Sequence, residues 1–575
     1  MSSDSYDFEE VINLFFNQIL FFMKKITLLF ALFTFLYGNA QWTTDTAVNT
    51  LVADVLNNDQ QVVKCPNGST FVVFWKSVPA PVNFELRVQL LNANGVQQFG
   101  TEGMLISNTI PMSTSTVLMK VTGDSKNNLY VGVTGTSNTA GQPIFAYKIN
   151  QMGTMLWGPN GISVGNGYLP TILPLEDLNE NGNVLIHYMP NTGGISKLQK
   201  YTSTGVPVWA AQVDVLSDNP SSPTSPADLF ELSNQQIMVV FHKRGTGVNS
   251  TLFAQKFNSS GVAQWTVPTQ LSNKGTAYNV MTYNGVQDGD VVYYGYSGKT
   301  GTRSDSFVQR INPDGTMPWG INGVDFDTNA TLYEVDTQIA FAPGSQYVWA
   351  MSSYTPSTQD LRGEYIQKFD KITGARQFTD NARQVFPVDN NYRTHAGKLQ
   401  LINDTPFFLI TEGINNGASP VPIKAVLLNS NGYFAWPEQT LPVATFSAPK
   451  LHITLTKPVN NSEAVVVFTE PKVTGQNKIY AQKFTLPTLG INDFETAENA
   501  VMLYPNPASS FFNIKAMSTI KSVAVYTTLG QNVFTKDLTD SMELNIPTQN
   551  WAKGLYSITI ETTDNKTLTK KLLKE

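Results

Sequence analysis

The sequence predicts an all-β protein in which a long array of repeats precedes a small C-terminal domain. Short apolar runs rich in β-branched and aromatic residues alternate with polar turns, which is typical of buried strands. One aromatic position also returns eight times, at intervals of 52 to 59 residues, and a period of this length indicates a repeat architecture. The eight aromatics are Trp42, Phe99, Trp157, Trp209, Trp265, Trp319, Phe378 and Trp436.

Each repeat has the same internal order. An apolar run such as Ile237–Phe241 is followed by a second strand that ends in Gln-Lys-Phe or a relative of it, as at Gln255–Phe257. An Asn-x-x-Gly turn comes next, in this repeat Asn258 to Gly261, and its glycine can take a positive φ without steric cost. We expect a third strand to end in the aromatic and a fourth to lie between the aromatic and the next apolar run.

A repeat of about 56 residues with four strands has the size of one blade of a β-propeller. It is too short for a β-sandwich domain, which needs ~100 residues. We therefore expect an eight-bladed propeller over residues 41–487, with seven blades as the alternative and the aromatics packed between neighbouring blades. The eighth apolar hairpin ends at Phe484, and no Gly-x-x-x-Trp strand follows it. The strand around Trp42 is therefore expected to complete the last blade and close the ring.

The N-terminal region predicts export. Two lysines after Met23 and the apolar stretch Ile26–Tyr37 form a signal peptide over residues 23–40, with cleavage between Ala40 and Gln41. The stretch is shorter than the ~20 residues that span a membrane, so no transmembrane anchor is expected in the mature chain. Residues 1–22 are acidic, unlike the start of a signal peptide. Translation is expected to begin at Met23, and a true N-terminal extension is the alternative.

After an expected linker at 488–498, residues 499–575 contain short alternating strands typical of a small antiparallel β-sandwich. Four motifs follow one another there: Tyr504-Pro505-Asn506-Pro507, a Leu-Gly-Gln turn at Gly530, Gly554-x-Tyr556, and a basic and apolar end with Lys570 and Lys571. This segment resembles the type A C-terminal sorting domain of the type IX secretion system of Bacteroidetes. The resemblance implies passage through the general secretion and type IX outer-membrane machinery, then release or attachment at the cell surface.

Composition and motifs give little sign of chemistry. The net charge of −6 and the absence of basic runs exclude nucleic-acid binding, and the single Cys65 excludes an intrachain disulfide framework. The four histidines, His187, His242, His395 and His452, lie in no catalytic motif, so no catalytic residue and no cofactor are expected.

Two further patterns are weak. Asp177, Asn179 and Asn181 match the first half of a calcium loop, but Tyr188 replaces the last carboxylate, so a polar turn is expected and a metal site is the alternative. The segment from Asp370 to Phe378 is similar to the tryptophan-docking repeat of quinoprotein dehydrogenases, which implies a docking role for Gly374 and Phe378 and nothing about a quinone.

We expect an exported, non-catalytic propeller that binds a glycan or a surface protein through loops at one mouth. A polysaccharide hydrolase or lyase is the alternative and would need two carboxylates ~5–10 Å apart at the mouth, whereas an apolar or tyrosine-lined mouth favours binding. An adhesin or gliding-related surface protein is a third alternative. The candidate loops are Ser77–Asn83, Gly245–Ser250, Ser297–Ser304, Ser353–Gly363 and Gly413–Pro422.

Overall fold

The computed structural model describes residues 42–109, 118–135, 142–177, 182–191, 193–216, 222–245, 250–276, 284–414, 419–457, 462–486, 501–563 and 567–575. They belong to two compact units, and the boundary between the units falls after Leu486. The predicted signal peptide, with its cleavage site at Ala40 and Gln41, and the predicted linker lie outside the described residues. Among the described residues, no helix is long and apolar enough to cross a membrane.

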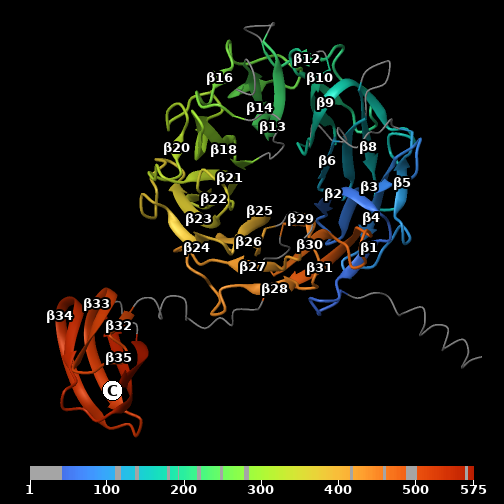
Figure 1. The fold of residues 1–575 in the computed structure, drawn as a ribbon. Coiled ribbons are helices and arrows are strands. Elements are labelled where there is room, and N and C mark those ends of the chain that lie inside the picture. Colours follow the sequence, from blue (N-terminus) through green and yellow to red (C-terminus); the bar gives the residue numbers. More distant parts are fainter. Residues whose placement is uncertain are drawn as a thin grey trace, which may run out of the picture. The chain divides into compact units, whose positions relative to one another are not determined.

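The first unit is a ring of antiparallel sheets (Figure 1). Six of its described sheets have four strands, and the first strand of each sheet lies nearest the ring centre while the fourth lies at the outside. They are β2 (Asn57–Lys64), β3 (Thr70–Ser77), β4 (Phe84–Leu91) and β5 (Met104–Ser107); β13 (Thr224–Leu232), β14 (Gln236–Arg244), β15 (Ser250–Phe257) and β16 (Thr269–Gln270); β17 (Gly285–Asp288), β18 (Val291–Thr300), β19 (Arg303–Ile311) and β20 (Val324–Asp325); β21 (Tyr333–Ala340), β22 (Tyr347–Thr355), β23 (Arg362–Asp370) and β24 (Arg383–Asp389); β25 (Thr394–Ile402), β26 (Thr405–Thr411), β27 (Ile423–Leu427) and β28 (Leu441–Ala444); and β29 (Leu451–Leu455), β30 (Glu463–Glu470), β31 (Lys478–Thr485) and β1 (Thr50–Ala53).

A further sheet of the ring has seven strands, because the long strand β9 takes part in two four-stranded groups. Its N-terminal half pairs with β8 and its C-terminal half pairs with β10. The strands are β6 (Leu118–Gly123), β7 (Leu129–Thr134), β8 (Pro143–Ile149), β9 (Ile162–Pro174), β10 (Val184–Pro190), β11 (Lys197–Tyr201) and β12 (Val213–Asp214). A short 3-10 helix, η1 (Ser233–Gln235), joins β13 to β14.

The second strand of each sheet is apolar on both faces because a neighbouring sheet packs against each face. In β3, Val73 belongs to an apolar cluster shared with Val131 of β7, and Val72 belongs to another shared with Val465 of β30. A strand that is buried on both faces does not alternate between polar and apolar residues. This explains why the second strands appear in the sequence as continuous apolar runs.

The order of strands within the repeat differs from the prediction. We expected a strand that ends in each aromatic, but the residues before it form a single bridge, as between Leu91 and Gln97. The Oδ1 of Asn92 accepts the backbone N–H groups of Asn94 and Val96, at 2.9 and 3.0 Å, and holds this segment as a tight turn. The outer strand of each sheet comes after the aromatic, and the first strand of the next sheet follows it. Both strands therefore lie between the aromatic and the next apolar run.

The N-terminal segment completes the last sheet. Strand β1 pairs antiparallel with β31, with Thr50 opposite Ala481 and Leu51 opposite Tyr480. The predicted closure is therefore confirmed, although the strand begins at Thr50 and not around Trp42. Closing the ring in this way covers the edge of β31, which would otherwise expose unpaired backbone groups.

The recurring aromatics lie against the glycine turn of the next repeat. A methyl group added at Gly261 would lie 3.0 Å from the Trp209 ring, and the indole N–H of Trp209 donates to Ser259 O at 3.0 Å. Because Gly261 has a φ of +79°, only glycine adopts this turn easily and leaves room for the ring. The same close approach occurs at Gly95 with Trp42, Gly153 with Phe99, Gly205 with Trp157, Gly315 with Trp265, Gly374 with Trp319, and Gly432 with Phe378.

The second unit is a five-stranded antiparallel sheet with its own apolar core. Its strands are β32 (Val501–Tyr504), β33 (Phe511–Thr527), β34 (Asn532–Pro547), β35 (Gly554–Thr562) and β36 (Thr567–Lys574). Strand β33 pairs with β32, β34 and β35, and its register with β34 shifts between Lys515 and Ile520. The core includes Phe512, Ile514, Val523, Ile546, Ile558 and Leu572.

Candidate functional site

Several strands nearest the ring centre carry a β-bulge. The pairing with the second strand shifts register in β2, β13, β21, β25 and β29. Two bulge residues, Asp336 in β21 and His452 in β29, have positive φ values of 56° and 50°. A bulge turns a side chain away from the regular alternation, and non-glycine residues at positive φ are concentrated at functional sites. Both features therefore indicate the inner wall of the ring as the candidate site.

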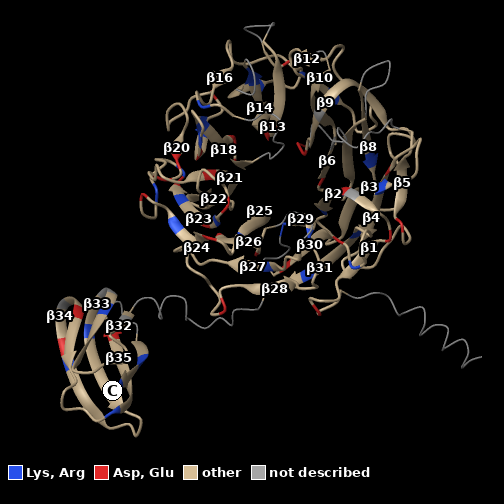
Figure 2. Cartoon of the chain, in the orientation of Figure 1, with Lys and Arg blue, Asp and Glu red and all other residues tan. Residues whose placement is uncertain are grey.

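Charged residues lie at or beside these bulges. Asp59 in β2 is 3.0 Å from the ring Nδ1 of His452, and this contact joins the first and the last sheet. The pKa of Asp228 in β13 is raised by burial, against the opposing effect of two lysines on other sheets, Lys398 in β25 and Lys120 in β6. Positive and negative residues are interspersed around the described part of the ring (Figure 2). The centre thus offers ionic groups of both signs.

A cavity of about 250 Å³ opens on one face of the ring, where the hairpins between second and third strands lie; we call this the hairpin face. Its wall comes from the sheets of β14, β18 and β21. The side chains are mainly hydroxyl, amide and aromatic: Thr276, Asn284, Tyr294, Tyr296, Ser297, Ser304 and Thr337, with His242, Lys299 and Asp336. Such a lining suits a polar, uncharged ligand.

Hydrogen bonds hold this wall in one conformation. The side chain of Asn284 accepts the N–H of Ile339 at 3.0 Å and also donates to Thr337 O. The hydroxyl of Thr337 lies 2.8 Å from that of Ser297 and 2.7 Å from that of Ser306. Side chains fixed by their own partners present a preformed surface, so binding there needs little ordering.

At the rim of the cavity, exposed Asp336 forms an ion pair with Arg362 of β23, the third strand of the same sheet, with 3.3 Å between Oδ2 and Nη1. The Arg362 guanidinium also lies over the ring of Tyr392, at 5.8 Å from its centroid. Of the carboxylates in the described residues, Asp336 is the one that lines this cavity. A pair of carboxylates of the kind used by glycosidases is therefore not found in its lining.

Ser353, His395 and Glu364 form a buried cluster on the same face, but their geometry is not that of a nucleophile triad. Both the hydroxyl of Ser353, at 3.2 Å, and Oε2 of Glu364, at 3.0 Å, lie next to the same ring nitrogen, Nδ1 of His395. In a triad the histidine is the base, and the nucleophile and the orienting carboxylate lie on different nitrogens of its ring. Burial opposes protonation of His395, but the adjacent Glu364 outweighs this effect and raises the pKa of His395.

A second cavity, of about 620 Å³, lies at the opposite face, where the turns between first and second strands are located. Asn284 lines both cavities. The charged residues in the wall of the second cavity are the exposed Lys398 and Lys457 and the half-buried Asp404. Much of the remaining wall comes from the segments Ala340–Pro343 and Leu399–Leu401. It has fewer fixed hydrogen-bonding side chains than the cavity of the hairpin face.

The structure brings only part of the predicted loops into the site. Ser297–Ser304 contributes to the cavity, but its pairing continues up to Thr300 with Arg303, so this segment is a hairpin and not a loop. Parts of Gly245–Ser250 and Gly413–Pro422 lie outside the described residues, as do Asn179 and Asn181 of the candidate calcium loop. The backbone N–H of Asp177, the described member of that loop, donates to Glu231 Oε1 at 3.0 Å.

Two histidines are buried structural residues of equivalent strands. The ring Nε2 of His187 lies 2.8 Å from the hydroxyl of Ser196, and burial lowers the pKa of His187 to about 3. His242 contacts the hydroxyl of Thr276 at 2.9 Å, and burial lowers its pKa to about 4. Both rings are therefore neutral at pH 7 and act as hydrogen-bonding core groups.

The first and the last motif of the C-terminal unit meet at its last strand. Asn506 donates to the backbone O of Lys571 at 2.9 Å and accepts the N–H of Leu573 at 2.9 Å. The Tyr556 ring is buried against Trp551, with 5.1 Å between centroids, and its hydroxyl donates to Ala552 O at 2.8 Å. Gly530 ends a tight turn at a φ of +80°. Motifs that are far apart in the sequence thus share one small fold.

Residues 502–575 match the family described as the secretion system C-terminal sorting domain. They are a type IX sorting domain. The protein is therefore exported to the cell surface or secreted, and the sorting domain implies the type IX secretion machinery as a partner.

No curated protein matches the chain. Similar solved structures include Drosophila Semaphorin 2a, with 9% identity over 94% of this chain and 99% of that chain and a TM-score of 0.40. The β-propeller domain of the Trilobed protease from Pyrococcus furiosus has 10% identity over 66% and 98% and a TM-score of 0.36. A protein of unknown function from Dyadobacter fermentans has 9% identity over 78% and 99% and a TM-score of 0.35. These likenesses are too weak to bear on function.

Proposed function

We propose that the ring is an eight-bladed β-propeller that works as an exported binding module and takes a glycan at the cavity of the hairpin face. Each four-stranded sheet counts as one blade, and the seven-stranded sheet counts as two that share β9; a single blade there would give seven. The eight aromatics support eight, because each is followed by one outer strand. In this proposal the aromatics are plates between neighbouring blades.

The lining of the cavity carries the proposal. Hydroxyl and amide groups next to tyrosine rings match the alternating hydroxyl and apolar faces of a sugar. The volume of about 250 Å³ suits the end of a glycan, whereas a protein partner would need an interface of roughly 800 Å² on each side. A surface protein remains the alternative ligand.

A polysaccharide hydrolase or lyase is the second candidate. It gains support only from Asp336, whose strained backbone and position at the rim are features of catalytic carboxylates. A second carboxylate of the described residues does not line the cavity, and Asp336 is paired with Arg362. Binding without turnover therefore fits the geometry better.

Export supplies the context of this proposal. The signal peptide would be removed after Ala40, and the sorting domain would then be read by the outer-membrane machinery. In this domain, which we take to be a small β-sandwich, Tyr504-Pro505-Asn506-Pro507, Gly530, Gly554, Tyr556, Lys570 and Lys571 would be the residues that form the signal. Asn506 supports this role because it ties the first motif to the last strand.

The test is a glycan and polysaccharide binding screen with the mature chain, run beside an assay for released reducing ends. Lys299→Ala and Asp336→Asn change the rim of the cavity, and Lys126→Ala, in the exposed turn between β6 and β7, is the control. We expect the two rim variants to bind at least tenfold more weakly, about 1.4 kcal/mol, and the control to bind normally. Equal binding by all three would contradict the location. Reducing ends released by the wild type and not by Asp336→Asn would favour the hydrolase.

A further inference from the structure

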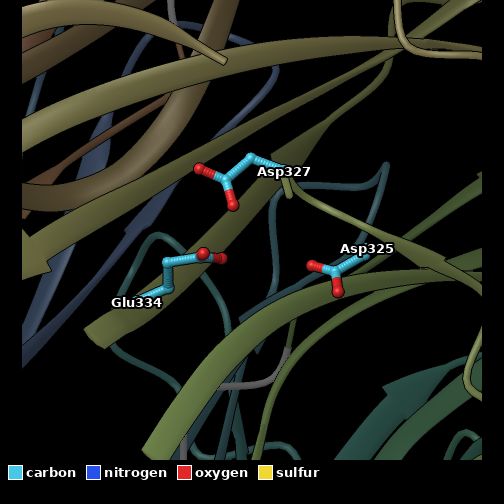
Figure 3. Close-up of side chains that lie close together, drawn as sticks. All are labelled: Asp325, Asp327 and Glu334. Carbon is cyan, nitrogen blue, oxygen red and sulfur yellow. The ribbon is translucent and has the colours of Figure 1, made fainter. Parts of the chain in front are cut away.

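Three carboxylates meet where two adjacent sheets of the ring come together. Asp325 ends β20, Asp327 follows it, and Glu334 comes from β21 of the next sheet. One oxygen from each lies within 4.8 Å of the others, and Figure 3 shows the three carboxylates turned toward a common space. Asp327 is 2% exposed and Glu334 is 1% exposed. Like charges this close and this buried cannot all stay ionised without a positive partner.

The hydrogen bonds of the cluster leave one buried oxygen without a donor. Oε2 of Glu334 accepts the backbone N–H of Ser306 at 2.9 Å, but Oε1 accepts no hydrogen bond. The nearest guanidinium nitrogen, Nη2 of Arg303, is 3.9 Å away and lies 2.6 Å from Asp305 instead. The oxygens of Asp327 accept from the N–H of Asn329, at 2.7 Å, and from the hydroxyl of Tyr354.

The charges around the cluster do not balance. Besides the three carboxylates, Asp305 adds a fourth negative charge. Two guanidiniums oppose them, Arg303 and Arg376, and Arg376 donates to the backbone oxygens of Asp325 and Asp327 at 3.0 and 3.3 Å. Lys274 also acts on Asp305, and Arg376 also pairs with Asp380 at 3.3 Å. Five negative and three positive groups leave an excess of two negative charges, which is the charge of one divalent cation.

The equivalent positions of other sheets show what is unusual about this cluster. In β21, Val335 is the last residue that pairs with β22 before the bulge, and Glu334 comes directly before it. His395 has the corresponding position in β25 and lies next to Glu364. Lys450 has the corresponding position directly before β29 and lies 3.0 Å from Glu470. In both cases, a residue of the opposite charge type lies beside the buried one. Glu334 faces two further carboxylates in the same place.

We propose that Asp325, Asp327 and Glu334 bind a divalent cation, and specifically Ca²⁺. Two oxygens bound to one Ca²⁺ at about 2.4 Å can be at most about 4.8 Å apart, and the three carboxylate oxygens lie within 4.8 Å of one another. Hard oxygen ligands without sulfur or nitrogen favour Ca²⁺ or Mg²⁺, and irregular carboxylate sets fit the flexible coordination of Ca²⁺ better.

The cation ties β20 to β21 and so fastens two neighbouring sheets next to the cavity, two residues before Asp336. Without a cation, the alternative way to neutralise the cluster is a proton held between Glu334 and Asp327. This fits the pKa of Glu334, which burial raises and which Asp327 raises further. The cation site does not depend on the ligand of the cavity.

The test uses the mature chain, stripped of metal with EDTA and titrated with Ca²⁺ by calorimetry, with thermal unfolding recorded alongside. We expect one Ca²⁺ per chain with a Kd of roughly 0.1–1 mM, typical of extracellular sites, a Tm that rises with Ca²⁺, and binding to Mg²⁺ at least tenfold weaker. Asp327→Asn and Glu334→Gln should each weaken Ca²⁺ binding at least tenfold. Asp214→Asn, at the end of the outer strand β12, is the matched control and should bind as the wild type does.

A second measurement, Tb³⁺ luminescence, uses only the wild type and does not depend on how well the variants fold. Tb³⁺ bound by the wild type should show luminescence sensitised by Tyr354, whose hydroxyl contacts Asp327, and Ca²⁺ should displace it. Absence of one-to-one Ca²⁺ binding by the wild type would overturn the proposal. So would a Tm that is insensitive to Ca²⁺ but rises in Glu334→Gln, because this result indicates the shared proton.

Discussion

The side-chain amide of Gln482 in β31 donates to the backbone carbonyl of Thr43 at 2.8 Å, although the two residues are 439 positions apart. In other sheets the equivalent glutamine makes this bond within its own repeat, to a residue at or just after the aromatic, as in Gln255 to Trp265 at 3.1 Å and Gln367 to Thr379 at 3.1 Å. In the last sheet, the N-terminal segment after Trp42 therefore replaces the segment that follows the aromatic of the same repeat in other sheets.

This relationship predicts that the ring needs its N-terminus to close. A chain that lacks residues 41–55 loses β1 and the burial of Val52, Ala53 and Val55, on the order of 5 kcal/mol in the free energy of unfolding. Chemical denaturation should show this loss. A synthetic peptide of residues 42–56 added in trans should raise the Tm of the shortened chain as its concentration increases. No effect of the peptide, with an unchanged stability of the shortened chain, would contradict the closure.

The contact between aromatics and glycines predicts a large difference between two glycine substitutions. In Gly261→Ala the new methyl group meets the Trp209 ring and Val213, whereas in Gly475→Ala, at almost the same φ, nothing lies within 4 Å. Both variants should lose roughly 1 kcal/mol from the left-handed backbone, and Gly261→Ala should lose a further ~1–3 kcal/mol from overpacking. Urea unfolding measures both, and equal losses would show that the turn does not need room for the ring.

The fold was predictable from the sequence to the extent that its signals are local. The aromatic period, the Asn-x-x-Gly turns and the truncated last repeat predicted the array and its closure, because each is encoded in a few adjacent residues. The position of the outer strand was not predicted. Residues such as Val96–Phe99 have the composition of a strand, but the side chain of Asn92 holds them in a turn, and the pairing that decides this is not visible in the sequence.

The candidate site was less predictable, because it depends on contacts between sheets. Ser297–Ser304 was named as a loop and does line the cavity, whereas Asn284 and Asp336 gave no signal. A bulge is defined by the pairing of two strands, so its position cannot be read from one of them. The alternation of Asp325 and Asp327 was a usable signal, but the third carboxylate, Glu334, belongs to the next sheet.

Burial of neutral His187 predicts a loss of stability in acid. Its folded pKa of about 3 lies below the unfolded value of about 6.5, so the unfolded chain binds a proton that the folded chain does not. Its contribution is complete above pH 6.5 and is lost, by roughly 1.4 kcal/mol per pH unit, as the pH falls from 6.5 toward 3. In His187→Gln, this part of the pH dependence should disappear. Parallel stability curves of the two proteins between pH 4 and 7 would show that His187 is protonated in the fold.

The last prediction concerns the sorting domain, in which Asn506 links the first motif to the last strand. Asn506→Ala removes the two hydrogen bonds to Lys571 and Leu573 and should destabilise this domain by about 1–3 kcal/mol. Asn532→Ala is the matched control, because its side chain is exposed and its hydrogen bonds to described residues go to the nearby Thr535. Both substitutions lie in the second unit, so we expect the unfolding of the ring to be the same in both variants.

Export should respond in the same order. If the tied end of β36 is what the outer-membrane machinery reads, Asn506→Ala should leave more protein in the periplasm than Asn532→Ala, and a chain that ends before residue 487 should remain there entirely as a folded ring. Cell fractionation with a protease-resistance check on the retained protein measures both. Normal surface delivery of Asn506→Ala, despite a destabilised domain, would show that the motif acts through its exposed side chains. Delivery of the shortened chain would show that the ring carries its own export signal.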